Sequence, residues 1–211
     1  MTSEETRDKI LRAFLALAAE RGMAVITTRD IAAAAGVNEV TVFRHFGDKA
    51  TLAREAVRRF HPAAALDAYE SAIDASTPQT AMRGLLRCLA ELQSQLAGRP
   101  ELLQFGLGEA ARYPDILDDL REIPAAARRM LTRAFEQAAD QLRPEVSIDA
   151  EVIGFLGMLL MLAAWRSRHW ADLTDPQVTA LLTARLRPLL RSGEPGPGQP
   201  GGSPPGMPPA W

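Results

Sequence analysis

The sequence has few of the residues from which cross-links and metal sites are built. Cys88 is the single cysteine among 211 residues, and only three histidines occur. One cysteine excludes an internal disulfide framework and is typical of a reducing compartment, while three scattered histidines are too few for an ordinary zinc site. We therefore expect no metal and no cofactor. We predict that Cys88 is a buried structural thiol; a redox sensor, the alternative, would need a stabilised thiolate.

Long apolar runs are also lacking. The longest uncharged apolar stretch, residues 152–165, has about 14 residues, fewer than the roughly 20 that a membrane-spanning helix requires. We therefore expect it to form a buried helix. Residues 2–5 are polar or acidic, in contrast to the basic and then apolar start of a secretory signal, so we expect a cytoplasmic location.

The formal charge is nearly balanced, at −2 for the whole chain. Residues 1–60 contain ten Lys or Arg and eight Asp or Glu, which gives +2, and the remainder contains fourteen and eighteen, which gives −4. A basic first part and an acidic second part are compatible with a DNA-facing region followed by a body, but the difference is too small to indicate nucleic-acid binding by itself.

Apolar residues recur at helical spacing, and no alternating β-branched run interrupts them, so the pattern predicts an all-α fold. The expected helices cover residues 4–21, 28–35, 39–46, 49–60, 63–75, 79–97, 101–112, 115–142, 148–170 and 176–191. Thirteen of the last twenty residues are Pro or Gly. Residues 192–211 are therefore predicted to be a disordered tail, with a ligand for polyproline-binding modules as the alternative.

The most informative segment is residues 26–52, where the spacing describes two short helices joined by a tight turn. Thr27 can cap the first helix together with Asp30, three residues later. Gly36 suits the turn because glycine tolerates a positive φ angle. Asn38 can cap the second helix, whose apolar residues return it to the core. This pattern predicts a helix-turn-helix, whose second helix fits the major groove of DNA.

The segment TTRDIAAAAGVNEVTVFRHFGDKATL, residues 27–52, resembles the TetR family of transcriptional regulators along its whole length. The likeness includes the aromatic-x-His-Phe sequence at residues 43–46 and the lysine at Lys49. It implies an N-terminal three-helix helix-turn-helix DNA-binding domain over residues 1–60 and a larger helical ligand-binding and dimerisation domain over residues 61–191. It also implies a homodimeric repressor, not an enzyme, that a small-molecule inducer releases from a double-stranded DNA operator.

Carried over position by position, the resemblance implies DNA contacts from Thr28, Arg29, Asn38, Glu39, Val40, Thr41, Phe43, Arg44, His45 and Lys49. Arg29 would contact a base or a phosphate, and Val40 could pack against a thymine methyl group. Glu39 either accepts from cytosine or faces solvent. Lys49 either holds a phosphate at the start of a helix or is a solvated surface lysine.

Three positions depart from the family's usual pattern or leave a choice open. Phe43 stands where the family usually has a tyrosine, so a phosphate-contacting hydroxyl is lost and the packing ring is kept. Arg44, at the next position, either reaches a phosphate or is an exposed charge. His45 either contacts a phosphate or packs between helices with its nitrogens satisfied.

One recognition helix makes too few contacts for a specific genomic site, so we expect a homodimer. The broad apolar faces of the last two helices predict its interface at Leu159, Leu162, Trp165, Val178, Leu181, Leu182, Leu186 and Leu189, which could also be ordinary core. By resemblance, the middle of the chain would hold a pocket for an apolar inducer. Its candidate lining, each member of which could equally be core, is Met82, Leu86, Leu102, Phe105, Met130, Phe135, Phe155 and Met158.

Two other classes of function remain open. A helical bundle could be an enzyme or a small-molecule carrier, although the sequence contains no metal-binding helix motif and no phosphate-binding glycine loop. A scaffold with a vestigial DNA-binding motif, in which the Pro-rich tail is the working part, is the third possibility.

Overall fold

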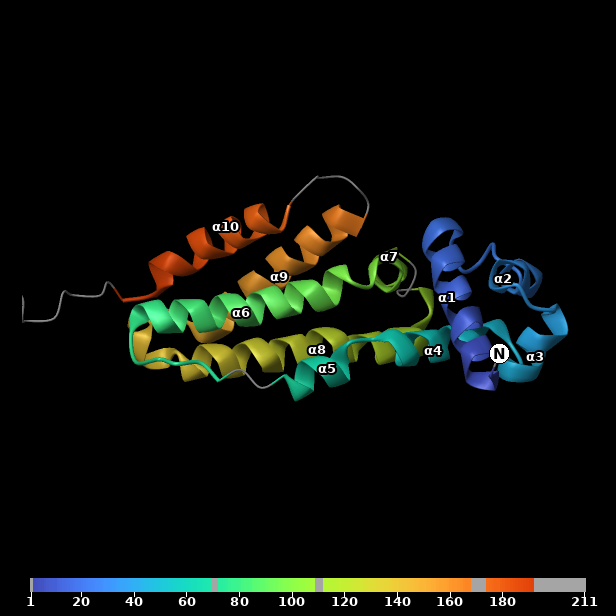
Figure 1. Cartoon of the computed structure of the whole chain (residues 1–211), viewed down its shortest axis with the longest axis horizontal. Helices are drawn as coiled ribbons and strands as arrows, with labels where there is room; N and C mark the ends of the chain where they lie inside the picture. The colour runs from blue at the N-terminus through green and yellow to red at the C-terminus, as the bar shows by residue number, and fades with distance from the viewer. Residues whose placement is uncertain (1, 70–71, 109–111, 168–173, 192–211) are drawn as a thin grey trace, which may run out of the picture.

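The computed structural model describes residues 2–69, 72–108, 112–167 and 174–191, which form α-helices with short connections (Figure 1). The helices are α1 (Ser3–Arg21), α2 (Thr28–Ala35), α3 (Glu39–Phe46), α4 (Lys49–Phe60), α5 (Ala63–Ala68), α6 (Pro78–Ala97), α7 (Pro100–Gly108), α8 (Pro114–Gln137), α9 (Ile148–Ser167) and α10 (Asp175–Leu186). Short 3-10 helices, Ala139–Gln141 and Arg187–Leu189, follow α8 and α10. The described ranges contain no strand, so the predicted all-α fold is confirmed.

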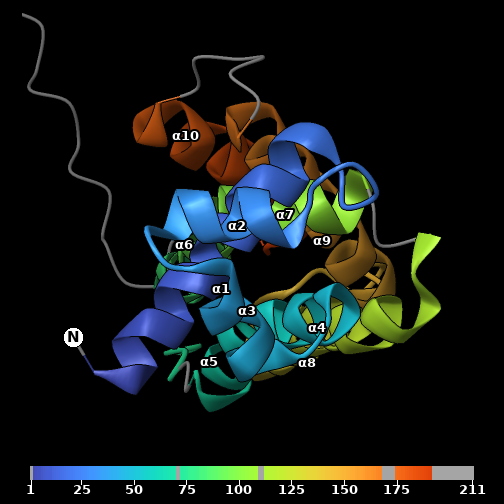
Figure 2. The same cartoon turned by 90° about the vertical axis from the view of Figure 1, so that its right-hand side faces the viewer.

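The helices are arranged in an elongated molecule (Figure 1). α1, α2, α3 and α4 gather at one end, and α6, α8, α9 and α10 extend away from them toward the other. The view turned by 90° places the first four helices in front of this body (Figure 2). The predicted helix-turn-helix therefore lies at one end of the elongated molecule.

Two clusters of buried side chains hold the molecule together. The N-terminal core joins residues of α1 to α4 with Leu102 and Phe105 of α7 and with the start of α8. The rings of Phe14 and Phe105 meet edge to face with their centroids 5.7 Å apart. The body core fills the space between the longer helices. The domain boundary near residue 60 stays a prediction, but by packing α7 belongs with the N-terminal helices.

The first two helices begin as the sequence predicts. The Thr2 hydroxyl accepts a hydrogen bond from the backbone N–H of Glu5 at 3.2 Å, and the Glu5 carboxylate accepts from the Thr2 N–H at 2.9 Å. Thr27 and Asp30 form the same reciprocal arrangement at the start of α2. These capping boxes satisfy N–H groups that a helix leaves without partners, and they fix where each helix starts.

The helix predicted over residues 63–75 is wrong in its second half, because α5 ends at Ala68. The Asp74 carboxylate accepts from the backbone N–H of Ser76 at 2.9 Å, a local bond that competes with helical hydrogen bonding. The Ile73 N–H donates instead to the Gln137 side chain at 3.1 Å. The last helix also ends early, at Leu186, before a 3-10 turn that contains a proline. The predicted tail, residues 192–211, lies outside the described residues.

The expectation that the apolar helix near the C-terminus is buried is wrong for most of its surface. Ile148–Arg166 is long and apolar enough to cross a membrane by length and composition, a test that core helices also pass, and 33% of that stretch is buried. Ile153 is 60% exposed, Met161 50% and Trp165 40%. α9 therefore presents an apolar face to the outside of this single chain.

Cys88 lies in the body core and is fully buried. Burial raises the pKa of its thiol to about 12, because apolar surroundings disfavour the thiolate. A redox sensor needs the thiolate at neutral pH, so this environment supports the predicted structural role.

Gln93 of α6 is the one buried polar side chain among the described residues, at 5% exposure. Neither its amide nitrogen nor its amide oxygen has a hydrogen-bond partner. Burying such groups unpaired is costly, so this amide destabilises the core in which it lies.

Replacing Gln93 with leucine should therefore stabilise the protein. We expect Gln93→Leu to raise the free energy of unfolding by ~1–3 kcal/mol, since it removes two unpaired polar atoms. Gln95→Leu, on the same helix, is the matched control and should lower stability, because Gln95 donates to Glu91 at 2.7 Å and accepts from Arg99 at 2.8 Å. Denaturant unfolding measures both. A destabilised Gln93→Leu variant would mean that the amide is satisfied in the folded protein.

Candidate nucleic-acid interface

The turn between α2 and α3 depends on Gly36. Its φ angle is 68° and its ψ angle 35°, in the left-handed region that side chains with a Cβ rarely adopt. Its N–H donates to the carbonyls of Ala32 and Ala33, and the N–H of Val37 donates to Ala32 at 3.0 Å. These bonds close α2 and turn the chain directly into α3, as the sequence predicts.

α3 is held from its inner side. Val42 and Phe46 are buried in the N-terminal core. The Arg7 guanidinium of α1 lies 4.8 Å from the centroid of the Phe46 ring and forms an ion pair with Glu55 of α4. A cation above an aromatic face is attractive, so Arg7 ties three helices together at this point. The orientation of α3 is therefore fixed by packing on α1 and α4.

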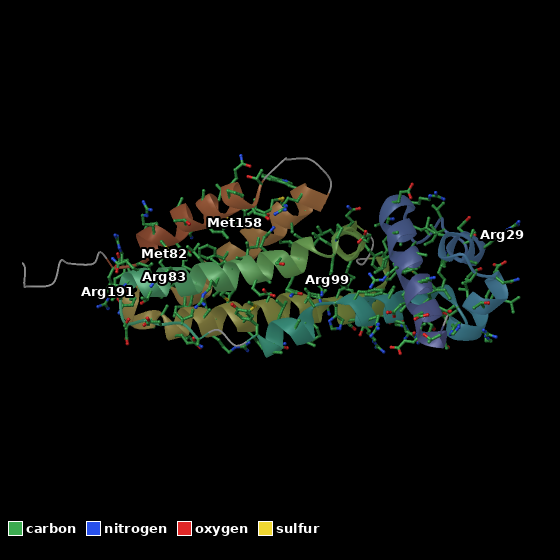
Figure 3. All side chains as sticks on the ribbon, viewed as in Figure 1. Arg29, Met82, Arg83, Arg99, Met158 and Arg191 are labelled. Carbon is green, nitrogen blue, oxygen red and sulfur yellow. The ribbon has the colours of Figure 1, made fainter. Side chains whose placement is uncertain are left out.

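The outer side of α3 carries the side chains that remain available to a partner. Val40 is 71% exposed and Phe43 49%, although both are apolar. Arg44 on α3 and Arg29 on α2 are exposed as well. Figure 3 shows Arg29 at the outer tip of the molecule, beyond the other helices. A helix that presents two exposed apolar side chains beside two arginines has the composition expected of a groove-binding surface.

Two of the predicted DNA-contacting residues, Thr28 and Glu39, form a hydrogen bond with each other. The Thr28 hydroxyl donates to the Glu39 carboxylate at 2.6 Å, which joins the start of α2 to the start of α3. Both side chains are half-buried. Glu39 therefore has a partner inside the protein, and this bond favours a role in positioning α3 over one in accepting from cytosine.

Lys49 also has internal partners. Its ammonium donates to the backbone carbonyls of Met23 and Ile26, each at 2.8 Å. These two bonds anchor the connection between α1 and α2 to the start of α4. An ammonium has three hydrogens, so one remains for another acceptor. The structure thus gives Lys49 a structural role. The sequence had suggested only a lysine that holds a phosphate or a solvated surface lysine.

The remaining predicted residues lie at the edge of this surface. Asn38 is exposed, and its side chain accepts from the Val40 N–H at 3.0 Å, as an N-cap. Thr41 is half-buried. His45 is half-buried too, with its ring centroid 6.0 Å from that of Phe46. The packing alternative for His45 therefore fits its position.

The nearby acidic side chains are used as helix caps. Hydrogen bonds from Thr27 hold the pKa of Asp30 below its usual range, and bonds from Thr51 do the same for Asp48. Both carboxylates are thus ionised at neutral pH, at the N-terminal ends of α2 and α4. Neither residue lies on α3, so neither adds a negative charge to the outer side of that helix.

The residues predicted to line a pocket fall in two places. Leu102 and Phe105 belong to the N-terminal core, and Met130, Phe135 and Phe155 to the body core. Met82, Leu86 and Met158 are half-buried and pack against the body core. The structure therefore does not bring all eight together.

Most residues predicted for a dimer interface are buried within the single chain: Leu159, Leu162, Val178, Leu182, Leu186 and Leu189. They are core residues of one protomer, because their side chains pack against other helices of the same chain. Trp165 and Leu181 are exposed, at 40% and 47%. The sequence pattern located the apolar helices but did not separate their inner from their outer faces.

Sequence reasoning missed Arg7 and Gln93. The sequence has many arginines, and no local pattern distinguishes Arg7 from those on the surface. Its partners Phe46 and Glu55 lie far along the chain. Gln93 did leave a signal: it is a polar residue at helical spacing from Met82 and Leu86 on an otherwise apolar face.

The structural role of Lys49 predicts a loss of stability when the ammonium is removed. Lys49→Met keeps the aliphatic stem but leaves two carbonyls without their donor, so the free energy of unfolding should fall by ~2 kcal/mol. Arg44→Met, on the exposed side of α3, should change it by less than ~0.5 kcal/mol. Denaturant unfolding checks both values. Unchanged stability of Lys49→Met would contradict the structural role.

Comparison with known proteins agrees with this geometry. The family model of bacterial regulatory proteins of the tetR family matches residues 10–56, which contain most of α1 and all of α2 and α3. The chain is 28% identical over 126 residues to the HTH-type transcriptional regulator YvkB of Bacillus subtilis, a match that covers 60% of this chain and 64% of YvkB. It is 42% identical over 79 residues to the HTH-type transcriptional repressor Rv3405c of Mycobacterium tuberculosis, covering 34% and 42%. The matches thus span less than two thirds of these relatives.

Solved structures share the fold over nearly the whole chain. NalD, the secondary repressor of the MexAB-OprM multidrug efflux pump in Pseudomonas aeruginosa, has a TM-score of 0.67 at 24% identity, covering 92% of this chain and 100% of NalD. The ketosteroid transcriptional regulator KstR2 of Mycobacterium tuberculosis has a TM-score of 0.64 at 24% identity, covering 88% and 95%. These relatives are transcriptional regulators and not enzymes. Residues 10–56 thus match the model of the tetR family of bacterial regulatory proteins, and the chain as a whole has the fold of the solved regulators NalD and KstR2.

Proposed function

We propose that the protein is a sequence-specific DNA-binding transcriptional regulator that acts as a homodimeric repressor and is released from its operator by a small-molecule inducer. The observation that carries this proposal is the outer side of α3. The short helix α3 is held on its inner side by the contact of Arg7 with its buried Phe46. It presents Val40, Phe43 and Arg44 to the outside, with Arg29 beside it.

These side chains divide between two kinds of DNA contact. Arg29 and Arg44 would bind phosphates, which supply affinity and fix the register of the helix. Val40 would pack against a base edge such as a thymine methyl group. Phe43 has no hydroxyl, so it would contribute packing and not a hydrogen bond.

Two copies are needed for a specific operator, and α9 offers the surface to join them. Ile153, Met161 and Trp165 are exposed on α9, and Leu181 is exposed on the neighbouring α10. A contiguous apolar face on a helix of a soluble regulator marks a contact with another chain. Gly157 lies between these residues on α9, and a Cβ there would meet no atom of the same chain within 4 Å. A glycine at this place would allow a second helix to approach closely.

For the inducer, the buried amide of Gln93 is the best candidate for a polar contact. It follows Met82 by eleven residues and Leu86 by seven, which places the three on one face of α6, and Met158 of α9 packs against the same core. An unpaired amide offers one donor group and one acceptor group in apolar surroundings. The inducer we propose is thus a neutral, largely apolar molecule that carries its own donor and acceptor.

A link between this region and the DNA-binding helices passes through Arg99. Its Nε donates to the backbone carbonyl of Phe60, at the end of α4, at 2.8 Å. Its Nη1 donates to the backbone and side-chain oxygens of Gln95 at 2.9 and 2.8 Å. Figure 3 places Arg99 between the body and the N-terminal helices. Gln93 lies about 6 Å of helix rise before the end of α6 at Ala97, and Arg99 follows two residues later, so a ligand at Gln93 that shifts α6 would also shift α4.

The test of DNA binding is a fluorescence titration against DNA from upstream of the protein's own gene, with scrambled competitor, at several salt concentrations. We expect specific binding. The slope of the logarithm of the binding constant against the logarithm of the salt concentration should become shallower by about one unit in Arg29→Ala and in Arg44→Ala, since each removes one phosphate contact. Arg121→Ala is the matched control, because Arg121 is an exposed arginine of α8 paired with Asp118. Failure to bind any DNA at low salt would contradict the proposal.

The dimer is tested by a charge on the α9 face. We expect the wild-type chain to sediment as a dimer and Met161→Glu as a monomer, since a carboxylate would be desolvated at the interface. DNA affinity of this variant should fall at least about tenfold, because two half-sites are no longer joined. Leu107→Glu, at a leucine 54% exposed on α7, should remain dimeric. A Met161→Glu dimer in analytical ultracentrifugation would contradict the assignment of this face.

A further inference from the structure

A groove of about 920 Å³ lies at the end of the body farthest from the helix-turn-helix. Its walls are the first turn of α6, the end of α10 with its 3-10 turn, and the segments at Arg143 and Arg191. Four arginines are among the residues that line it: Arg83, Arg143, Arg187 and Arg191. These lining residues include no aspartate or glutamate. Figure 3 shows Met82, Arg83 and Arg191 close to one another at this end, opposite Arg29.

Two of the arginines are held in place by a small antiparallel bridge. Leu142 pairs with Leu190. Arg143 follows the first and donates its Nε to the carbonyl of Leu190 at 3.2 Å, and Arg191 follows the second and donates its Nε to the carbonyl of Leu142 at 2.9 Å. Each guanidinium uses one of its five N–H donors in this way, which leaves its terminal nitrogens for a ligand. The pair is thus positioned before any ligand arrives.

The other two arginines form no hydrogen bond in the described part of the chain. Arg83 and Arg187 are exposed and form no hydrogen bond or ion pair with a described residue. Hydrogen bonds from Ser76 hold the pKa of Asp74 below its usual range, and Arg83 adds to this effect, but Asp74 does not line the groove. The positive end of the α6 dipole, capped at Thr77, lies at the same wall. Positive charge therefore exceeds negative charge along this groove, whose lining includes four arginines and no carboxylate.

We propose that this groove binds a small phosphate ester that carries an apolar group. Arginine forks match the geometry of phosphate oxygens, and four of them suit a ligand with more than one negative charge. Met82, Pro188 and Leu190 add apolar lining for the rest of the molecule. The volume is within the range of small-molecule sites. Met82 lines the groove, but Gln93 lies about 16 Å of helix rise further along α6, and α3 is at the other end of the molecule, so this ligand is distinct from the DNA and from the neutral inducer proposed above.

The test is isothermal titration calorimetry of the full chain with octyl phosphate, which joins a phosphate dianion to an apolar chain. We expect saturable binding, with inorganic phosphate and octanol each weaker by at least about tenfold, because each lacks one half of the recognised chemistry. Equal binding of inorganic phosphate or of octanol would overturn the proposal. No DNA is present, so the result is independent of the proposed regulatory function.

The matched variants locate the site. Arg83→Ala/Arg187→Ala should weaken octyl phosphate binding at least about tenfold, since two charge-assisted contacts are lost. The control Arg87→Ala/Arg121→Ala removes the same charge outside the groove and should change affinity less than about twofold. Thermal unfolding of the first variant should be unchanged, because neither arginine has a bond to lose. Equal weakening in both double variants would overturn the site. So would displacement of octyl phosphate by short duplex DNA of unrelated sequence, which would assign the groove to nucleic-acid phosphates.

Discussion

The packing of the buried side of α1 governs how the helices of the DNA-binding end are placed. Phe14, at the centre of this helix, is fully buried and meets Phe105 of α7, so the core of the DNA-binding end is completed by a helix that lies much later in the sequence. α1 also supplies Arg7, which clamps Phe46 of α3. A short helix such as α3 has little stability alone and takes its orientation from this packing. The surface that would meet DNA is therefore fixed by contacts behind it.

Around the helix-turn-helix, some polar side chains form hydrogen bonds within the protein and others are exposed. Lys49 and the Thr28–Glu39 pair bond to the protein itself and hold the segments between α1 and α4 in register. Arg29 and Arg44 remain on the outside. A buried or half-buried polar group costs free energy unless it is paired, so the paired ones stabilise the motif while the exposed arginines keep their charge available to phosphates.

The body has an apolar outer face on α9, an unpaired amide at Gln93, and an arginine-lined groove at its far end. Each departs from what stability alone would select: an exposed apolar helix, a buried polar group, and four arginines gathered in a groove whose lining has no carboxylate. Such departures are expected where a surface or a core is shaped by binding. They lie at separate places, so a second chain, a neutral ligand and an anion could be accommodated together.

The sequence is enough to specify the helical fold, the helix-turn-helix with its caps at Thr27 and Asn38, and the turn at Gly36, because these follow from spacing and local hydrogen bonding over a few residues. It misplaced the end of α5, where the contact of Ile73 with Gln137 across 64 residues competes with the helix. Packing between distant segments sets which faces of α9 and α10 are outside, turns Lys49 inward, and brings Arg143 and Arg191 together. Periodicity shows that a helix has an apolar side, but burial and pairing depend on chain segments far apart in the sequence.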